Sequence, residues 1–153
     1  MNQRAFILLA AGGSAALMLG ALAFQHWGGL APCKMCIWQR YPHVVAIVVG
    51  AVALALPRAG LILLGALAAA TTSAIGFYHV GVEQRWWEGP STCTSGSTQG
   101  LSADELLDQI LSAPLVRCDD IAWDFLGISM AGWNGLISLA LVAVWLMALR
   151  RPA

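Results

Sequence analysis

Residues 59–82 read AGLILLGALAAATTSAIGFYHVGV, a run without a single Asp, Glu, Lys or Arg. A helix needs about 17–25 apolar residues to cross the hydrocarbon core of a bilayer, so this run is long enough to span a membrane. Three further apolar segments lie at roughly 5–24, 41–56 and 128–149. The segment at 41–56 is the shortest, and it needs its flanking residues to reach the required length.

The composition of the whole chain agrees with a membrane protein. Of the 153 residues, 59% are hydrophobic and only 10% are charged, which is too little charge to cover a soluble globule of this size. Backbone groups in lipid must find partners within their own segment, so each run is predicted to be a helix. The alternating pattern of a membrane-spanning strand is missing from all four runs. Segments rich in small residues favour close helix packing, and we expect an all-α bundle of four transmembrane helices in one domain over residues 1–153.

The charges indicate how the bundle is oriented. Basic residues without acidic neighbours mark one set of helix ends: Arg4, Arg58, Arg150 and Arg151. The other ends hold every Asp and Glu together with Lys34, Arg40, Arg85 and Arg117. The positive-inside rule therefore predicts that both termini are cytoplasmic and that loops at about 25–40 and 83–127 face outward. The first segment also has features of a signal peptide, but its apolar run exceeds the usual length of roughly 7–15 residues, so we expect it to be retained.

The long outer loop contains one segment with a helical pattern. Ser102 and Glu105 form a capping box, which predicts a helix N-terminus at this point. Leucines and isoleucines follow on one face, and Pro114 ends the pattern. This short amphipathic helix is expected either to lie on the membrane surface or to pack against its own loop.

Four cysteines lie on the predicted outer side. Cys33 and Cys36 form a Cys-x-x-Cys pair after the first apolar segment, while Cys93 and Cys118 bracket most of the long loop. Three disulfide pairings are possible, and Cys33–Cys36 with Cys93–Cys118 is favoured because each pair stays within one loop. A bridge across about 25 residues would stabilise the fold by roughly 3–4 kcal/mol, whereas the tight Cys-x-x-Cys ring is typical of redox-active pairs. A four-cysteine zinc site is the alternative, although Cys93 and Cys118 lack the spacing of a ligand pair.

Several charged or polar side chains lie close to these cysteines. Arg40 sits at the edge of an apolar segment, where a guanidinium is costly and a functional role is expected. A helix that began by Cys36 would place the two residues on one face, so that Arg40 would stabilise a Cys36 thiolate and an anionic reduced acceptor. Pro42 leaves this geometry open, because proline kinks a helix interior. Histidines that are candidates for hydrogen bonds to a ligand carbonyl are His26, His43 and His79.

The residues around the cysteines resemble the bacterial disulfide bond formation protein B (DsbB) family. The first match is Phe24-Gln25-His26, followed by Pro32-Cys33-Lys34-Met35-Cys36-Ile37 and Arg40. The second is Cys118 with Trp123-Asp124-Phe125-Leu126-Gly127, Met130 and Trp133. The topology and the four-cysteine layout extend the resemblance over the whole chain.

The resemblance implies a quinone-dependent thiol oxidase of the bacterial inner membrane. Such an enzyme reoxidises a periplasmic thioredoxin-like dithiol oxidase of the DsbA type and passes the electrons to ubiquinone or menaquinone. Carried over by motif, Cys93 forms the mixed disulfide with the partner, Cys118 exchanges with Cys33, and Cys36 meets the quinone beside Arg40. His79 is implied as a contact to a ring carbonyl.

Other functions stay open at this point. A relative that serves one dedicated partner has the same pattern of residues. A non-catalytic membrane scaffold would use the two disulfides, or zinc, for structure alone. A passive quinone-binding subunit would not need Cys93 and Cys118.

Overall fold

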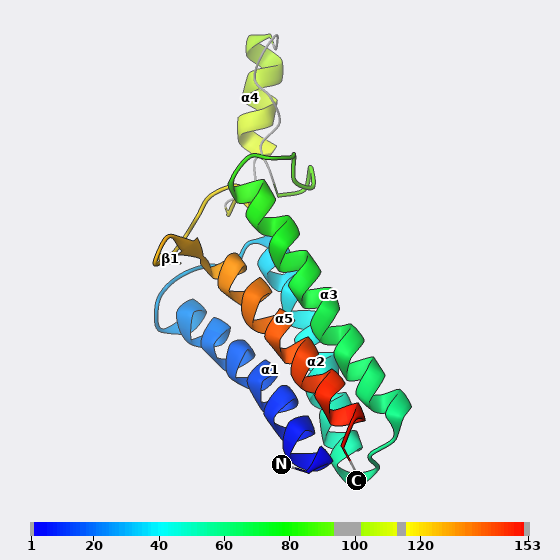
Figure 1. Cartoon of the computed structure of the whole chain (residues 1–153). Coiled ribbons are helices and arrows are strands. Elements are labelled where there is room, and N and C mark those ends of the chain that lie inside the picture. Colours follow the sequence, from blue (N-terminus) through cyan, green and yellow to red (C-terminus); the bar gives the residue numbers. More distant parts are fainter. Residues whose placement is uncertain (1, 94–101, 113–115, 152–153) are drawn as a thin grey trace.

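The computed structural model describes residues 2–93, 102–112 and 116–151. Within these ranges, four helices are long and apolar enough to cross a membrane: α1 (Gln3–His26), α2 (Lys34–Ala55), α3 (Ala59–Glu83) and α5 (Met130–Leu149). A shorter helix, α4, covers Ala103–Ser112, and two short strands cover Asp124–Phe125 (β1) and Ile128–Ser129 (β2). The four long helices form one bundle, as predicted, and the protein has the architecture of a multi-pass membrane protein (Figure 1).

The second spanning helix begins at Lys34, not near residue 41 as the sequence suggested. Its N-cap is Cys33, whose sulfur accepts the backbone N–H of Cys36 at 3.1 Å. Pro42 therefore lies inside α2, where it has no N–H to donate to the carbonyl of Trp38. The expected outer loop of residues 25–40 shrinks accordingly, and both Cys36 and Arg40 belong to the helix.

Small residues bring the helices together. A Cβ atom added at Gly76 of α3 would lie 3.0 Å from the carbonyl oxygen of Ala131 in α5. At Gly65, about three turns earlier in α3, an added Cβ would lie 2.6 Å from the ring of Trp145 in α5, which is itself fully buried. Packing of this kind is the main force between helices in lipid, where the hydrophobic effect is absent. Large apolar side chains instead face outward, including Leu8, Leu19, Val48, Leu63 and Leu67.

Both termini lie at one end of the bundle, and the loop elements lie at the other (Figure 1). The start of α2, the end of α3, the β1–β2 hairpin and α4 are all at this second end (Figure 1). All four cysteines belong to segments at that end, because Cys33 caps α2 while Cys93 and Cys118 follow α3 in the chain.

The loop segments at this end contain local order of their own. β1 and β2 pair antiparallel around Leu126 and Gly127, which both have positive φ angles. Positive φ at both central residues is typical of the type I′ turn that suits a tight hairpin. In α4, the backbone N–H of Ser102 donates to the Glu105 carboxylate at 2.8 Å, so the predicted capping box is present. Pro114 and the side chains of Leu106 and Ile110 lie outside the described residues, and a membrane-surface position of α4 stays a prediction.

Candidate active site

The Cys33–Cys36 pair lies at the N-terminus of α2. Cys33 is buried and Cys36 half-buried, and both are free thiols. The side-chain hydrogen bond that Cys33 shares with Cys36 raises the pKa of Cys33, and burial raises it further. Cys33 therefore keeps its proton, while Cys36 lies in the first turn of the helix, where the backbone N–H groups and the helix dipole favour an anionic sulfur.

Cys93 and Cys118 form a disulfide. Their Cα atoms are 5.4 Å apart, and neither side chain is exposed. The backbone N–H of Cys118 also donates to the carbonyl of Cys93 at 2.7 Å. This is one of the two bridges in the favoured pairing, and it leaves only two thiols for the four-cysteine zinc alternative. The described residues thus contain one oxidised pair and one reduced pair.

The two pairs meet through Cys33 and Cys118. The sulfur atoms of these residues and a ring nitrogen of His79 all lie within 4.8 Å of one another. The residues come from three separate parts of the chain: the cap of α2, the last turns of α3 and the segment that precedes the hairpin. The arrangement can support thiol–disulfide exchange, which requires one sulfur to approach another along an unobstructed path.

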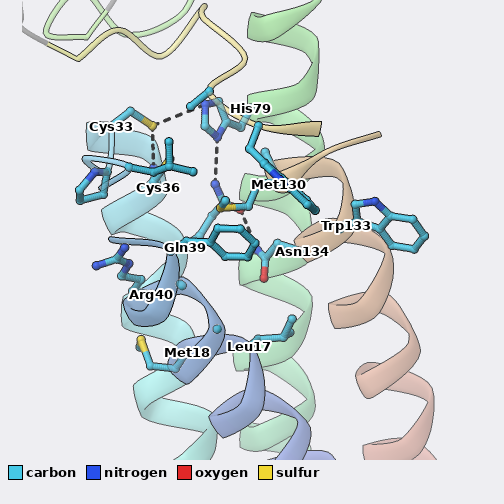
Figure 2. Close-up of a pocket in the computed structure, with 18 of the residues that line it drawn as sticks. Leu17, Met18, Cys33, Cys36, Gln39, Arg40, His79, Met130, Trp133 and Asn134 are labelled. Atoms are coloured by element: carbon cyan, nitrogen blue, oxygen red, sulfur yellow. Dashed lines mark hydrogen bonds between the residues drawn. The ribbon is translucent and has the colours of Figure 1, made fainter. Parts of the chain in front are cut away.

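His79 holds this meeting point together. Its side chain is 2% exposed, and its Nε2–H donates to the backbone carbonyl of Cys118 at 3.1 Å. Its Nδ1 accepts from the amide nitrogen of Gln39 at 3.0 Å, and Nε2 also lies 3.6 Å from the sulfur of Cys33 (Figure 2). The Glu83 carboxylate, which accepts from the hydroxyl of Ser129, lies 3.9 Å from the same ring nitrogen. Both nitrogens of His79 therefore have protein partners.

A cavity of about 650 Å³ opens beside Cys36 and extends down between α1, α2 and α5. Most of its lining is apolar, including Leu17, Met18, Phe24, Met130, Trp133 and Ile137. On α2, the lining residues Cys36, Arg40 and His43 follow one another at intervals of four and three residues along one helix face. Other segments contribute further polar lining: His79, Glu83, Arg117, Asp120 and Asn134. Figure 2 shows Arg40 on α2 below Cys36, on the side of the helix that looks toward Met18.

Arg40 keeps its charge available at this cavity. Its Nη1 donates to the side-chain oxygen of Gln25 in α1 at 2.6 Å. Gln25 is neutral, and among the described residues no carboxylate lies within ion-pair distance of the guanidinium. An uncompensated cation beside Cys36 can stabilise negative charge on that sulfur or on a ligand in the cavity.

Some residues of the site were not identified from the sequence. Gln39 and Asn134 are joined by a hydrogen bond of 2.7 Å from the Asn134 amide nitrogen to the Gln39 side-chain oxygen. Polar side chains within spanning helices are a signal for function, and both residues carry it. By contrast, His26 is exposed at the end of α1 and does not line the cavity.

A bundle of four apolar helices that brings a dithiol into contact with a loop disulfide defines a membrane protein of thiol–disulfide chemistry. Comparisons with known proteins agree with this class. The family model for disulfide bond formation protein DsbB matches residues 3–148. The chain belongs to the DsbB family.

Individual relatives cover nearly the full length of the chain. The disulfide bond formation protein B of Azoarcus sp. (strain BH72) is 35% identical over 164 residues, which cover 98% of this chain and 95% of the relative. The protein of the same name from Polaromonas sp. (strain JS666 / ATCC BAA-500) is 34% identical and covers 90% of this chain and 85% of its own length. Disulfide bond formation protein B 2 of Pseudomonas aeruginosa PAO1 is 32% identical, with 97% and 89% covered.

Proposed function

We propose that this protein oxidises a periplasmic thioredoxin-like dithiol oxidase of the DsbA type and passes the electrons to a membrane quinone. The observation that carries the proposal is the approach of Cys33 to Cys118 within 4.8 Å, with an apolar cavity directly behind Cys36. A scaffold with static bridges needs neither the contact between the two pairs nor the cavity.

The first step takes place at the loop disulfide. A thiolate of the partner attacks Cys93 and releases Cys118 as a thiolate, and the second partner thiolate then frees Cys93. The partner leaves with a disulfide, and Cys93 and Cys118 hold the two electrons and two protons. Cys93 is fully buried, so docking of the partner must uncover its sulfur.

The second step passes the electrons between the pairs. Cys118 attacks Cys33 of the Cys33–Cys36 disulfide and releases Cys36, after which Cys93 attacks Cys118 and restores the loop disulfide. The result is one oxidised pair in the loop and two thiols at the start of α2. The described structure has the same distribution of bonds, with Cys93 and Cys118 joined and Cys33 and Cys36 free.

The cavity fits a quinone by its chemistry. Its walls suit an apolar tail and ring, and Arg40 has a charge without an acidic partner among the described residues. A bound quinone would accept the two electrons and two protons of the dithiol as Cys33 and Cys36 form a disulfide. Cys36 supplies the thiolate at the ring, and Arg40 stabilises the negative charge that develops there.

His79 lines the same cavity, but its nitrogens are engaged by Gln39 and Cys118. A contact to a ring carbonyl, as the resemblance implies, would require His79 to give up one of these bonds. We therefore assign His79 first to positioning Cys118 against Cys33.

We further propose that residues 1–153 form a single integral domain of the bacterial inner membrane. Both termini and the turn at Pro57–Arg58 would be cytoplasmic, and all four cysteines periplasmic. The support is the excess of basic residues at the end of the bundle where the termini lie (Figure 1).

The test uses the purified protein in detergent, a reduced thioredoxin-like dithiol protein and a short-chain quinone, with loss of quinone absorbance as the readout. Wild type is expected to turn over, and Cys36→Ser and Cys93→Ser are expected to be inactive. Dithiothreitol provides the matched control, because it can reduce Cys33–Cys36 directly and should sustain quinone reduction in Cys93→Ser but not in Cys36→Ser. Folded protein that reduces no quinone with either donor would refute the proposal and favour the scaffold.

A further inference from the structure

A buried polar network extends from His79 into the bundle and ends at His43. Gln39 links His79 to Asn134, and the side-chain oxygen of Asn134 lies 2.8 Å from Nε2 of His43. Thr72 joins from α3, within 3.2 Å of the Asn134 amide nitrogen. The network thus connects α2, α3 and α5 below the cysteines, and Figure 2 shows its upper part with Gln39 between His79 and Asn134.

Backbone carbonyls determine which atom donates in each bond of this network. Gln39 Nε2 lies 3.3 Å from the carbonyl of Met35, which can only accept, so the nitrogen is correctly placed there. Its oxygen therefore faces Asn134 and must accept from the Asn134 amide nitrogen. Thr72 donates to the carbonyl of Gln39 at 2.9 Å, so its oxygen is also free to accept from Asn134. The bonds of His79 agree with this assignment. The carbonyl of Cys118 can only accept, so Nε2 of His79 carries the proton, and Nδ1 accepts from the amide nitrogen of Gln39.

The consequence for His43 is a defined tautomer. The side-chain oxygen of Asn134 can only accept, so Nε2 of His43 carries the proton and donates to it. Nδ1 of the neutral ring is then a hydrogen-bond acceptor. His43 is 3% exposed, and Nδ1 has no hydrogen-bond partner among the described residues.

A buried acceptor without a partner is uncommon in folded proteins and calls for an explanation. His43 lines the cavity three residues beyond Arg40, or about 4.5 Å further along the helix axis. Nδ1 is enclosed in this structure, so the contact proposed below requires the imidazole to turn Nδ1 toward the cavity. The geometry points to His43 as a binding residue of the cavity, whose Nδ1 accepts a hydrogen bond from a ring hydroxyl.

This inference rests on the proposed function and adds to it a preference of the cavity for hydroquinone over quinone. A quinone presents carbonyl oxygens, which also only accept and would face Nδ1 lone pair to lone pair. A hydroquinone presents hydroxyl groups, which can donate to Nδ1 while the opposite ring oxygen lies near Arg40. His43 therefore makes the cavity favour the reduced ligand, formed when Cys33 and Cys36 give up two electrons and two protons and join in a disulfide.

The preference can be measured without turnover. Cys36→Ser provides a background in which the ligand is not consumed, and Trp123 and Trp133 line the cavity, so ligand binding should quench tryptophan fluorescence. The ligands are a decyl-tailed dimethoxymethyl-benzoquinone and its hydroquinone, titrated without oxygen. The quantity of interest is the Kd of the quinone divided by the Kd of the hydroquinone.

Adding His43→Leu should lower this ratio about tenfold, mainly through weaker hydroquinone binding, as expected for one lost hydrogen bond. His43→Gln keeps an acceptor and should recover part of the ratio. The matched control is His26→Leu, an exposed histidine outside the cavity, which should leave the ratio unchanged. Gel filtration and helical circular dichroism verify that each variant is folded.

The outcomes separate the two proposals. Binding of both ligands with an unchanged ratio in His43→Leu would overturn the role of His43 and leave the proposed function in place. An equal loss of both ligands in a folded His43→Leu would also overturn it, because the residue would then only shape the cavity. Failure of the Cys36→Ser parent to bind either ligand would instead count against the proposed function.

Discussion

Replacing His79 by phenylalanine distinguishes two roles for this histidine: positioning Cys118 against Cys33, and contacting a carbonyl of the quinone. Phenylalanine keeps an aromatic ring but removes the hydrogen bonds of His79. The carbonyl of Cys118 loses the donor that the structure records for it, Gln39 loses one of two acceptors, and the sulfur of Cys33 loses its 3.6 Å contact with Nε2. The loop that holds Cys118 would then be less firmly positioned against Cys33. We expect slower exchange between the two pairs and little change in the step at the quinone.

The size of the effect follows from burial. A buried group left without a hydrogen-bond partner costs about 1–3 kcal/mol. Gln39 still donates to Met35, so the main cost is that of the Cys118 carbonyl, which we take as about 2 kcal/mol. At 1.4 kcal/mol per factor of ten, exchange should slow by roughly thirtyfold.

One experiment in a Cys93→Ser background reads out both steps. Quinone is added to the fully reduced protein, and loss of its absorbance reports oxidation of Cys33 and Cys36. Cys118 then attacks Cys33, and because Cys93 is missing the Cys33–Cys118 bridge accumulates and can be measured by peptide mapping after acid quenching.

In this background His79→Phe should slow formation of the bridge roughly thirtyfold and leave quinone loss nearly unchanged. His26→Phe, at an exposed position, is the matched control and should change neither rate. Slower quinone loss with normal formation of the bridge would refute the positioning role and assign His79 to the quinone.

Two further predictions concern packing and thiol reactivity. Gly65→Ala would place a methyl group 2.6 Å from the ring of Trp145 and should lower the unfolding free energy in detergent by about 1–3 kcal/mol. The control is Gly12→Ala, whose added methyl group has no atom within 4 Å and should cause no loss of stability. Equal thermal stabilities of the two variants would contradict the packing argument. In the reduced pair, N-ethylmaleimide at pH 7 should label Cys36 before Cys33. Cys33 is buried, and its hydrogen bond with Cys36 and its burial raise its pKa above the ordinary value of 9.0, so it stays protonated. Labelling of Cys33 should therefore require a higher pH than an ordinary thiol needs, and mass spectrometry of early time points that found Cys33 labelled first would contradict this assignment.

The sequence was sufficient for the bundle but not for the start of α2. Hydropathy and charge identified all four spanning segments, because length and polarity are local properties of the chain. The cap of α2 was missed because cysteine is not among the usual N-cap residues, and because Pro42 looked like the start of a helix rather than its interior.

The candidate site was predictable to different degrees. The Cys-x-x-Cys spacing and the family resemblance drew attention to the cysteines and Arg40. No local pattern could indicate that Gln39 and Asn134, which lie 95 residues apart, share a hydrogen bond, because this contact depends on how α2 packs against α5. The same holds for the tautomer of His43, which depends on backbone carbonyls from other parts of the fold.

The sulfur that caps α2 has a mechanical consequence. As a thiol, Cys33 accepts the backbone N–H of Cys36, but a sulfur bonded to Cys36 or Cys118 is a different and more constrained acceptor. Loss of an N-cap costs about 0.5–2 kcal/mol, enough to unwind the first turn of a helix part of the time. Each catalytic cycle would therefore loosen and retighten the end of α2 that leads to Arg40. Amide hydrogen exchange at Met35 and Cys36 would then be faster when Cys33 is in a disulfide than when it is a thiol, and would report the redox state of the protein.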